Sequence, residues 1–183
     1  MRSLKHHEQK LLRKVKLYEP WKNEGSIREA QVMRRYNLRD REDYSRYNKL
    51  CGIVTKLASL VKTLPQDDKF RIKVTEQLCD RMYNLGLVNR RNSLEACAKV
   101  NVSAFCRRRL PVVLTSNKWT ENVKEATQFV EQGHFQVGNE VVKDPNTLVS
   151  RTMEDHVSWA DSSRIKRKIQ AYKNVLDDYD LMA

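Results

Sequence analysis

Glycine is scarce in this chain: its 183 residues include five glycines, and none stands in a GxxxxGK or GxGxxG pattern. Loops of those two types bind nucleotide phosphates because glycine lets the backbone approach them closely. The chain also has no GxSxG or HExxH motif and no paired-carboxylate site. These absences argue against a nucleotide-dependent enzyme or a hydrolase, so we predict a protein that binds and does not catalyse.

Cysteine and histidine are sparse as well, with four of each. No two cysteines have the CxxC spacing of a metal or redox site, and the histidines are not spaced to complete a zinc site. We therefore expect no metal and no cofactor, and we expect reduced core thiols in an intracellular protein. The residues concerned are Cys51, Cys79, Cys97, Cys106, His6, His7, His134 and His156.

Long hydrophobic runs are missing too. No stretch approaches the ~20 apolar residues that a membrane-spanning helix needs. The basic segment from Met1 to Lys16 is not followed by the apolar run of a secretion signal. The sequence therefore predicts neither secretion nor membrane insertion.

Positive charge is what the chain has in excess. The formal net charge is +12, and such a surplus favours polyanions, with nucleic acid first and an anionic membrane surface second. Most of the surplus lies in residues 1–100, where Lys and Arg outnumber Asp and Glu by 23 to 12, against 12 to 11 in the remainder. The N-terminal half should therefore supply most of the attraction to a polyanion.

Hydrophobic periodicity, capping residues and turn signals predict a mostly helical α+β fold. Ser26 and Glu29 match a capping box at a helix start, and Gly138-Asn139 is a turn dipeptide between two strands. The expected helices are 5–17, 26–36, 43–64, 68–85, 94–98, 102–114 and 121–132, with a basic helix after Ser162 or Ser163. The expected strands are 134–137 and 141–142, with weaker candidates at 148–151 and 157–160.

Two of these helices have a regular apolar stripe, which predicts the core of the N-terminal half. In the helix 43–64 the stripe consists of Leu50, Val54, Leu57, Ala58 and Val61. In the helix 68–85 it consists of Phe70, Val74, Leu78, Met82 and Leu85. We expect the two helices to pack as an antiparallel hairpin, with Pro65 ending the first and Gly86 following the second.

Three consecutive arginines, Arg107, Arg108 and Arg109, are the leading candidates for binding. Successive helical residues point about 100° apart, so the three cannot all face a core. Guanidinium groups bind phosphate bidentately, which favours an RNA backbone as ligand. The alternative is that one arginine pairs with an acid such as Glu131 or Glu154 and stabilises the fold.

The other candidate RNA-binding residues are cations or hydrogen-bonding side chains, either after the arginine triplet in the C-terminal part of the chain or in the N-terminal helices. For the last basic helix, nuclear import and simple solvation remain alternatives. The candidates are Lys118, Asn122, Lys124, Gln132, His134, Gln136, Arg151, Arg164, Lys166, Arg167, Lys168, Arg34, Arg35, Arg39 and Arg41. The apolar face formed by Leu4, Leu11, Leu12 and Val15 has no obvious partner within the chain and suggests a protein-docking helix.

The segments LCDRMYNLGLV, RRRLPVVL and ATQFVEQGHFQVGNEVVKDPNTLV, together with Arg151, resemble the S-four family of ribosomal small-subunit proteins. The resemblance implies an N-terminal helical domain, residues 1–106. It also implies an S-four-type RNA-binding domain of two helices and a small antiparallel sheet, residues 107–173, before an acidic tail at 174–183. Three departures concern RNA contacts: Asn122-Val123 replaces a Ser-Arg pair, Gly138-Asn139 replaces Asn-Gly, and the loop 115–120 with Trp119 differs from the ribosomal form.

Three further segments, LKHHEQKLLRKV, RRYNLRDREDYSRYNKL and SRTMEDHVSWADSSRIKRKI, resemble the branch of that family found in the U3 small nucleolar ribonucleoprotein. This resemblance implies a nucleolar factor of the small-subunit processome that helps U3 small nucleolar RNA pair with pre-ribosomal RNA for 18S processing. It also implies two protein partners, an acidic scaffold like M-phase phosphoprotein ten and a Brix-domain protein. The alternatives are a mature ribosomal protein of the S-four family and a basic protein-docking scaffold.

Overall fold

The computed structural model describes residues 3, 5–15 and 24–173, with the backbone alone for 12–15 and 24–27. The N-terminal half is helical. It comprises α1 (His6–Val15), α2 (Glu24–Tyr36), α3 (Arg41–Thr63), α4 (Lys69–Asn84), α5 (Leu94–Ala98) and α6 (Val102–Arg107). Asp68 caps α4, Ser93 caps α5 and Asn101 caps α6, each by accepting a backbone N–H.

The second half begins with α7 (Leu110–Ser116) and α8 (Val123–Glu131). A small sheet follows, made of β1 (Phe135–Val137), β2 (Glu140–Val141) and β3 (Val157–Trp159), with α9 (Arg151–Glu154) before β3 and α10 (Arg164–Tyr172) after it. The sheet order is β2-β1-β3 and both pairings are antiparallel. Val137 pairs with Glu140, so the predicted dipeptide Gly138-Asn139 forms the two-residue turn. The predicted fold class is confirmed.

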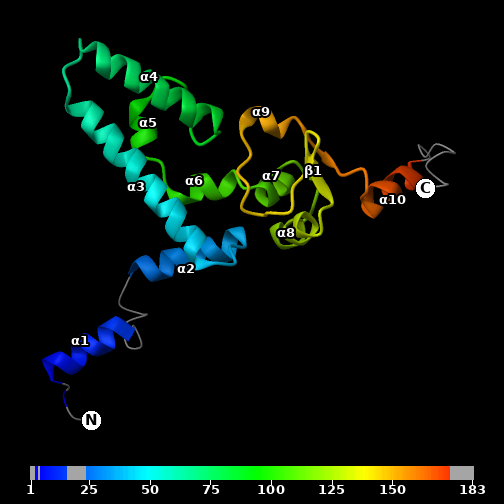
Figure 1. Ribbon diagram of the computed structural model, residues 1–183, viewed down its shortest axis with the longest axis horizontal. Coiled ribbons are helices and arrows are strands. Elements are labelled where there is room, and N and C mark those ends of the chain that lie inside the picture. The colour runs from blue at the N-terminus through cyan, green and yellow to red at the C-terminus, as the bar shows by residue number, and fades with distance from the viewer. Residues whose placement is uncertain (1–2, 4, 16–23, 174–183) are drawn as a thin grey trace.

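Two hydrophobic cores organise the molecule. The first lies among α2 to α6 and includes Tyr47, Ala58 and Phe105, with the rings of Tyr47 and Phe105 stacked. The second lies among α7, α8 and the sheet, around Leu114 and Phe135. Figure 1 shows α3, α4 and α5 on one side of the molecule and α7, α8 and the sheet on the other, while α10 extends beyond the sheet.

Several sequence predictions about the helices are corrected. The helix 26–36 begins earlier, at Glu24, so Ser26 lies within its first turn and is not the cap. The helix 102–114 is two helices, because the chain turns at Arg108 and Arg109, and Pro111 occupies the first turn of α7. The weak strand 148–151 is absent from the assigned strands: Leu148 forms an isolated bridge with Arg109, and Arg151 begins α9.

The predicted apolar stripes are only partly correct. Val54, Ala58 and Val61 of α3 and Leu78 and Met82 of α4 are buried as expected. Four other members are exposed: Leu50, Leu57, Phe70 and Leu85. The α3 core face is completed instead by Tyr47 and Cys51, which continue the buried row toward the N-terminus of the helix.

Candidate RNA-binding surface

Arg109 does not reach the surface. It is 1% exposed, and its guanidinium donates from Nη1 to the backbone oxygen of Tyr36 at 3.0 Å and from Nη2 to Oδ1 of Asn146 at 2.6 Å. The amide of Asn146 in turn donates to Oδ2 of Asp43 at 2.6 Å. This chain of bonds connects α2, α3 and the start of α7, so Arg109 joins the two halves and is not available for RNA.

Arg108 also has a structural role. Its Nε donates to the backbone oxygen of Val149 at 2.9 Å, and its Nη2 forms an ion pair with Glu154 at 2.9 Å. Pairing of one arginine with Glu154 was the alternative left open by the sequence, and the structure confirms it. Arg107 is the member of the triplet whose side chain is exposed, so phosphate contact from this cluster is restricted to that residue.

Arg151 is a third connector between the halves. Its Nε donates to the backbone oxygen of Tyr83 at 2.8 Å and its Nη2 to that of Val88 at 3.1 Å. Its guanidinium carbon also lies 4.4 Å from the centroid of the Tyr83 ring, a cation–π distance. These contacts occupy the donors that were predicted to face RNA.

The cations predicted in the N-terminal helices divide into two groups. Arg39 pairs with Glu131 at 2.8 Å and Arg41 pairs with Glu29 at 2.7 Å. Arg34 and Arg35 end α2, are exposed, and form no ion pair with any described residue. Arg34 and Arg35 therefore have the more accessible charge of the four.

Arg34 and Arg35 lie beside the start of α8, and the guanidinium carbon of Arg35 is also 5.7 Å from the centroid of the Tyr36 ring. Together with Asn122 and Lys124 they line one open cleft of about 770 Å³. Asn122 is the N-cap residue of α8, yet its Oδ1 accepts no capping bond and its amide N–H groups donate to no described residue, so this side chain is available to a ligand. A helix N-terminus with unbonded N–H groups also favours anions. Two acids, Glu121 and Glu125, line the same cleft, which leaves a small cation surplus there.

Asn37, which the sequence analysis did not identify, connects the end of α2 with α8. Asn37 follows α2 in a left-handed conformation, with φ of 49°. Its amide donates to Oγ1 of Thr127 on α8 at 3.2 Å. An asparagine directly after a helix with basic last-turn residues is the sequence signal for such a turn, but its partner 90 residues away has no local signal.

The remaining candidates lie around the second half. Lys118, Lys124, Gln132, Arg164, Arg167 and Lys168 are exposed. Gln136 is half-buried on β1. His134 faces inward enough for its Nδ1 to lie 3.0 Å from Oγ of buried Ser163, and its ring packs edge-on against Phe129. Lys166 pairs with Asp161. The most accessible cations of α10 are therefore Arg164, Arg167 and Lys168.

The structure describes only some of the residues that were predicted to form a protein-docking helix. Leu4 lies outside the described residues, and the side chains of Leu12 and Val15 are not described. Leu11 of α1 is 61% exposed, which agrees with an open apolar face. The predicted acidic tail, residues 174–183, also lies outside the described residues.

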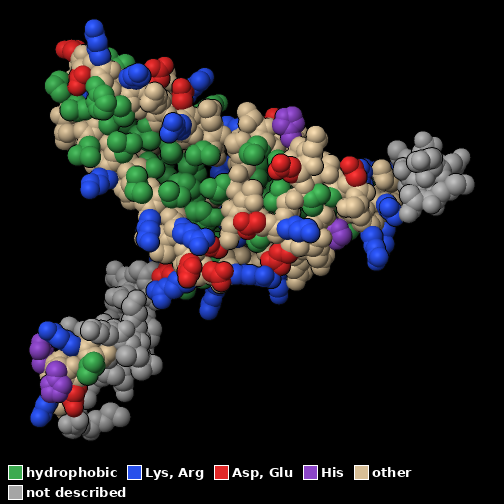
Figure 2. Space-filling model, in the orientation of Figure 1, with side chains coloured by type: hydrophobic (Ala, Val, Ile, Leu, Met, Phe, Trp, Pro, Cys, Tyr) green, Lys and Arg blue, Asp and Glu red, His purple; other side chains and the backbone are tan. Residues whose placement is uncertain are grey.

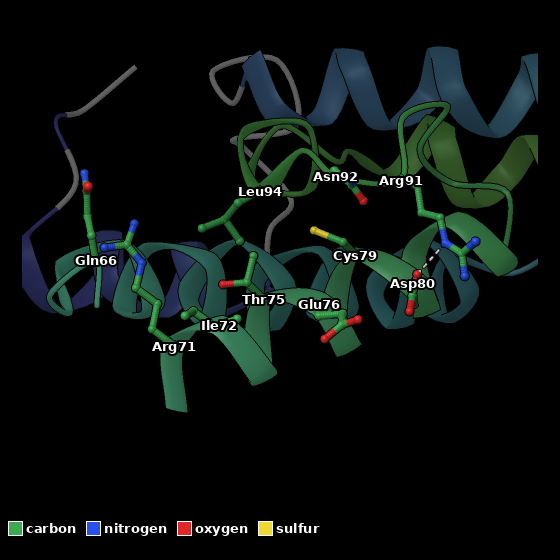
Figure 3. Close-up of a pocket in the computed structure, with 10 residues that line it drawn as sticks. All are labelled: Gln66, Arg71, Ile72, Thr75, Glu76, Cys79, Asp80, Arg91, Asn92 and Leu94. Carbon is green, nitrogen blue, oxygen red and sulfur yellow. Dashed lines mark hydrogen bonds and ion pairs between the residues drawn. The ribbon is translucent and has the colours of Figure 1, made fainter. Parts of the chain in front are cut away.

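A second hollow, between α4 and the segment before α5, is lined by charges of both signs (Figure 3). Arg91 pairs with Asp80 at 2.7 Å across one end of it. Arg71 uses its Nη1 to bond the backbone oxygen of Leu64 at 2.6 Å. Because these cations already have partners, the hollow is a weaker phosphate site than the cleft beside α8.

The cysteines offer no nucleophile. All four are free and buried, and burial raises the pKa of the Cys106 thiol to about 11. Burial likewise raises the pKa of the Cys97 thiol to about 11, with neighbouring Cys79 adding to the shift. Thiols with such a pKa stay protonated at neutral pH. Among the described residues no group of three or more acidic, histidine or cysteine side chains is placed to hold a metal ion.

Within the same residues, no helix is both long and apolar enough to cross a membrane. Two family models match the chain in sequence. Residues 3–107 match the ribosomal protein S4/S9 N-terminal domain, and residues 108–155 match the S4 domain. The two matches meet where α6 ends and the chain turns into α7.

Individual relatives cover nearly the whole chain. The U3 small nucleolar ribonucleoprotein protein IMP3 of Homo sapiens is 48% identical over 100% of both chains. The protein of the same name from Saccharomyces cerevisiae is 45% identical over 98% of both. The small ribosomal subunit protein uS4 of Picrophilus torridus is 26% identical over 79% of each chain.

Proposed function

The chain belongs to the IMP3 family of U3 small nucleolar ribonucleoprotein proteins, within the wider S4 family, and from that premise we propose an RNA-binding factor of ribosome assembly. It acts by binding, without catalysis. Its site is the cationic cleft, which we define as Arg34, Arg35, Asn122 and Lys124. The single observation that carries this site is the convergence on the amino-terminal end of α8 of two arginines that form no ion pair with the described residues.

Phosphate contact explains how the cleft binds RNA. Arg34 and Arg35 suit phosphate oxygens because guanidinium groups are bidentate donors, and the amide of Asn122 supplies a further donor. Arg107 and the exposed cations of α10 extend contact beyond the cleft. Phosphate contacts position an RNA strand without reading its bases. Sequence selection therefore comes from pairing between RNA strands, which the protein holds in place.

We propose that the bound RNAs are U3 small nucleolar RNA and pre-ribosomal RNA, and that the protein promotes their pairing for 18S processing. Neutralising phosphate charge on two strands at once lowers their mutual repulsion. A protein that binds the paired state more tightly than the separated strands shifts the equilibrium toward pairing without hydrolysing a nucleotide.

The cleft is tested by charge reversal in the full chain. Arg34→Glu/Arg35→Glu should weaken binding of a U3 RNA fragment by tenfold or more, because about two phosphate contacts become repulsive. Lys73→Glu/Arg90→Glu makes the same charge change at exposed cations outside the cleft and is the matched control. Glu121→Gln, in the cleft, should tighten binding. Equal losses of RNA affinity in the two double variants would contradict this site and would indicate diffuse electrostatic attraction instead.

Pairing is tested separately, by fluorescence transfer between a labelled U3 fragment and a labelled pre-ribosomal fragment. The wild-type chain should raise the fraction of paired strands, and Arg34→Glu/Arg35→Glu should raise it less. Binding without any gain in pairing would leave an RNA-binding protein and refute the pairing role.

Location and partners follow from the same premise. We propose residence in the nucleolus, within a U3 particle that includes an acidic scaffold like M-phase phosphoprotein ten and a Brix-domain protein. Tagged chain should co-sediment with U3 RNA in large particles and be absent from translating small subunits. Its presence on translating subunits would instead support a mature ribosomal protein, as the name of the more distant small ribosomal subunit proteins uS4 describes them.

A further inference from the structure

Helix α3 has two apolar faces, and only one of them is buried. The buried face includes Tyr47, Val54, Ala58 and Val61 and packs within the first core. A second row, which we call the apolar stripe, consists of Leu50, Ile53, Leu57 and Leu60. These side chains are 42%, 64%, 37% and 57% exposed. Figure 2 shows hydrophobic side chains gathered in the angle between α3 and α4.

The spacing of the apolar stripe is that of a helix-packing seam. Its members follow one another at intervals of three, four and three residues. At about 100° per residue their directions fall within an arc of roughly 80°. This repeat lets a second helix lie along α3 with its own apolar residues between those of the stripe. Ordinary surface helices have a single apolar face, so the second face of α3 indicates a partner.

Charge beside the stripe indicates what kind of partner. Lys49 and Lys56 lie along its outer edge, about 60° to 80° from the middle of the stripe, and both are exposed. Neither forms an ion pair with any described residue. From residue 44 to residue 63 every charged side chain is basic. A helix lying on the stripe would therefore gain from acidic residues on the flank that faces these lysines.

The same lysines disfavour other occupants. Two copies of α3 packed through their stripes would place lysine rows against each other. The chain's own α1 is basic too, with Lys10, Arg13 and Lys14 against Glu8. RNA is a poor fit because aliphatic side chains offer bases neither ring stacking nor hydrogen bonds. An acidic amphipathic helix satisfies both the apolar row and its cationic edge.

We propose that the apolar stripe of α3 docks an amphipathic helix from another protein, with the partner's acidic residues against Lys49 and Lys56. This surface is separate from the cationic cleft and goes beyond RNA binding. Because it uses neither Arg34, Arg35 nor α8, loss of one activity should leave the other intact.

The occupant is identified by site-specific photo-crosslinking in cells. The full chain carries a benzophenone amino acid in place of Ile53 and is expressed in yeast, the source of a 45% identical relative. The control carries the same group in place of Ser59, which points away from the stripe on the same helix. The expected adduct at position 53 is a peptide with net negative charge and apolar residues at intervals of three and four, absent from the Ser59 control.

Four results would overturn the proposal. They are an adduct with RNA, an adduct with a second copy of the chain, an adduct with a basic or uncharged segment, and no adduct above the Ser59 control. Each one assigns the stripe to another occupant or to none.

Binding of the crosslinked segment, made as a synthetic peptide, then tests the chemistry. Ile53→Ser/Leu60→Ser should weaken it by about tenfold or more, because two exposed aliphatic anchors are lost. Lys49→Glu/Lys56→Glu should weaken it as well, and that loss should shrink at high salt. Met153→Ser, at an exposed apolar side chain on α9 that belongs to neither binding surface, is the matched control. Wild-type peptide affinity in both stripe variants, with the fold intact by circular dichroism, would refute the docking surface even if RNA binding persists.

Discussion

At the scale of single residues, Arg109 shows how burial decides between structure and function. Arg109→Met keeps the length of the side chain but leaves the oxygen of Tyr36 and the side chain of Asn146 without their donor. We expect a loss of about 3–5 kcal/mol in unfolding free energy, the range for breaking a buried charged network. Urea denaturation measures it. Arg107→Met is exposed and should stay within about 0.5 kcal/mol of wild type, and equal losses would contradict the assignment.

Gly86 is the second residue whose role the structure explains. Its φ is 73°, and a Cβ placed there would lie 2.8 Å from Nε of Arg108. Gly86→Ala should therefore destabilise the chain by about 1 kcal/mol or more, from backbone strain and displacement of that guanidinium. Gly52→Ala, inside α3 with nothing within 4 Å of the added atom, should stabilise by about 0.5–1 kcal/mol. Thermal unfolding should show a lower midpoint for Gly86→Ala and a higher midpoint for Gly52→Ala. Midpoint shifts of the same sign in both variants would contradict the geometry.

The same residues show what sequence can predict. Gly86 and the Gly138-Asn139 turn were predicted because a residue after a helix or in a tight turn has a local signature, and both glycines have positive φ. The roles of Arg108 and Arg109 could not be assigned, since their partners Glu154 and Asn146 are 46 and 37 residues away. The cationic cleft has the same origin: the α2 arginines and Asn122 meet only through tertiary packing.

At the scale of elements, none of the described residues of α10 is buried, so we expect this helix to add little to stability and, under the proposed function, to contact RNA. Arg164→Gln/Arg167→Gln/Lys168→Gln should leave the unfolding midpoint unchanged. The same change should weaken RNA binding and reduce the slope of log affinity against log salt by up to about 2, since each single-strand phosphate contact contributes about 0.7. Lys166→Gln, at a cation already paired with Asp161, is the control. An unchanged slope in the triple variant would mean that α10 does not touch RNA.

Helix α3 shows why exposed apolar residues are hard to place from sequence. Leu50 and Leu57 fit a helical period as well as the buried Val54 and Val61 do, so periodicity alone assigned them to the core. The structure separates two rows about 100° apart because α5 and α6 cover only one side of the helix. A pattern wider than one face is itself informative, because a second apolar row that stays exposed is a candidate surface for packing against another chain.

At the scale of the whole molecule, three arginines join two cores that each resemble a domain of their own. Arg108 and Arg109 lie at the junction of α6 and α7, and Arg151 reaches from α9 to the end of α4 and the segment after it. Their bonds to backbone oxygens add to the apolar contact that Val112 and Leu148 of the second half make with the first core. We therefore expect the two cores to unfold as one cooperative unit.

Two optical signals distinguish the cores. Trp119 and Trp159 pack with Phe135 in and around the second core, so their fluorescence follows that core. Far-ultraviolet circular dichroism follows the helices, which lie mainly around the first. In urea the two transitions should coincide for the wild-type chain and separate for Arg109→Met/Arg151→Met, because the bonds between the cores are lost while each core keeps its own packing. Separate transitions in the wild type would show that the arginines position the halves without coupling their stability.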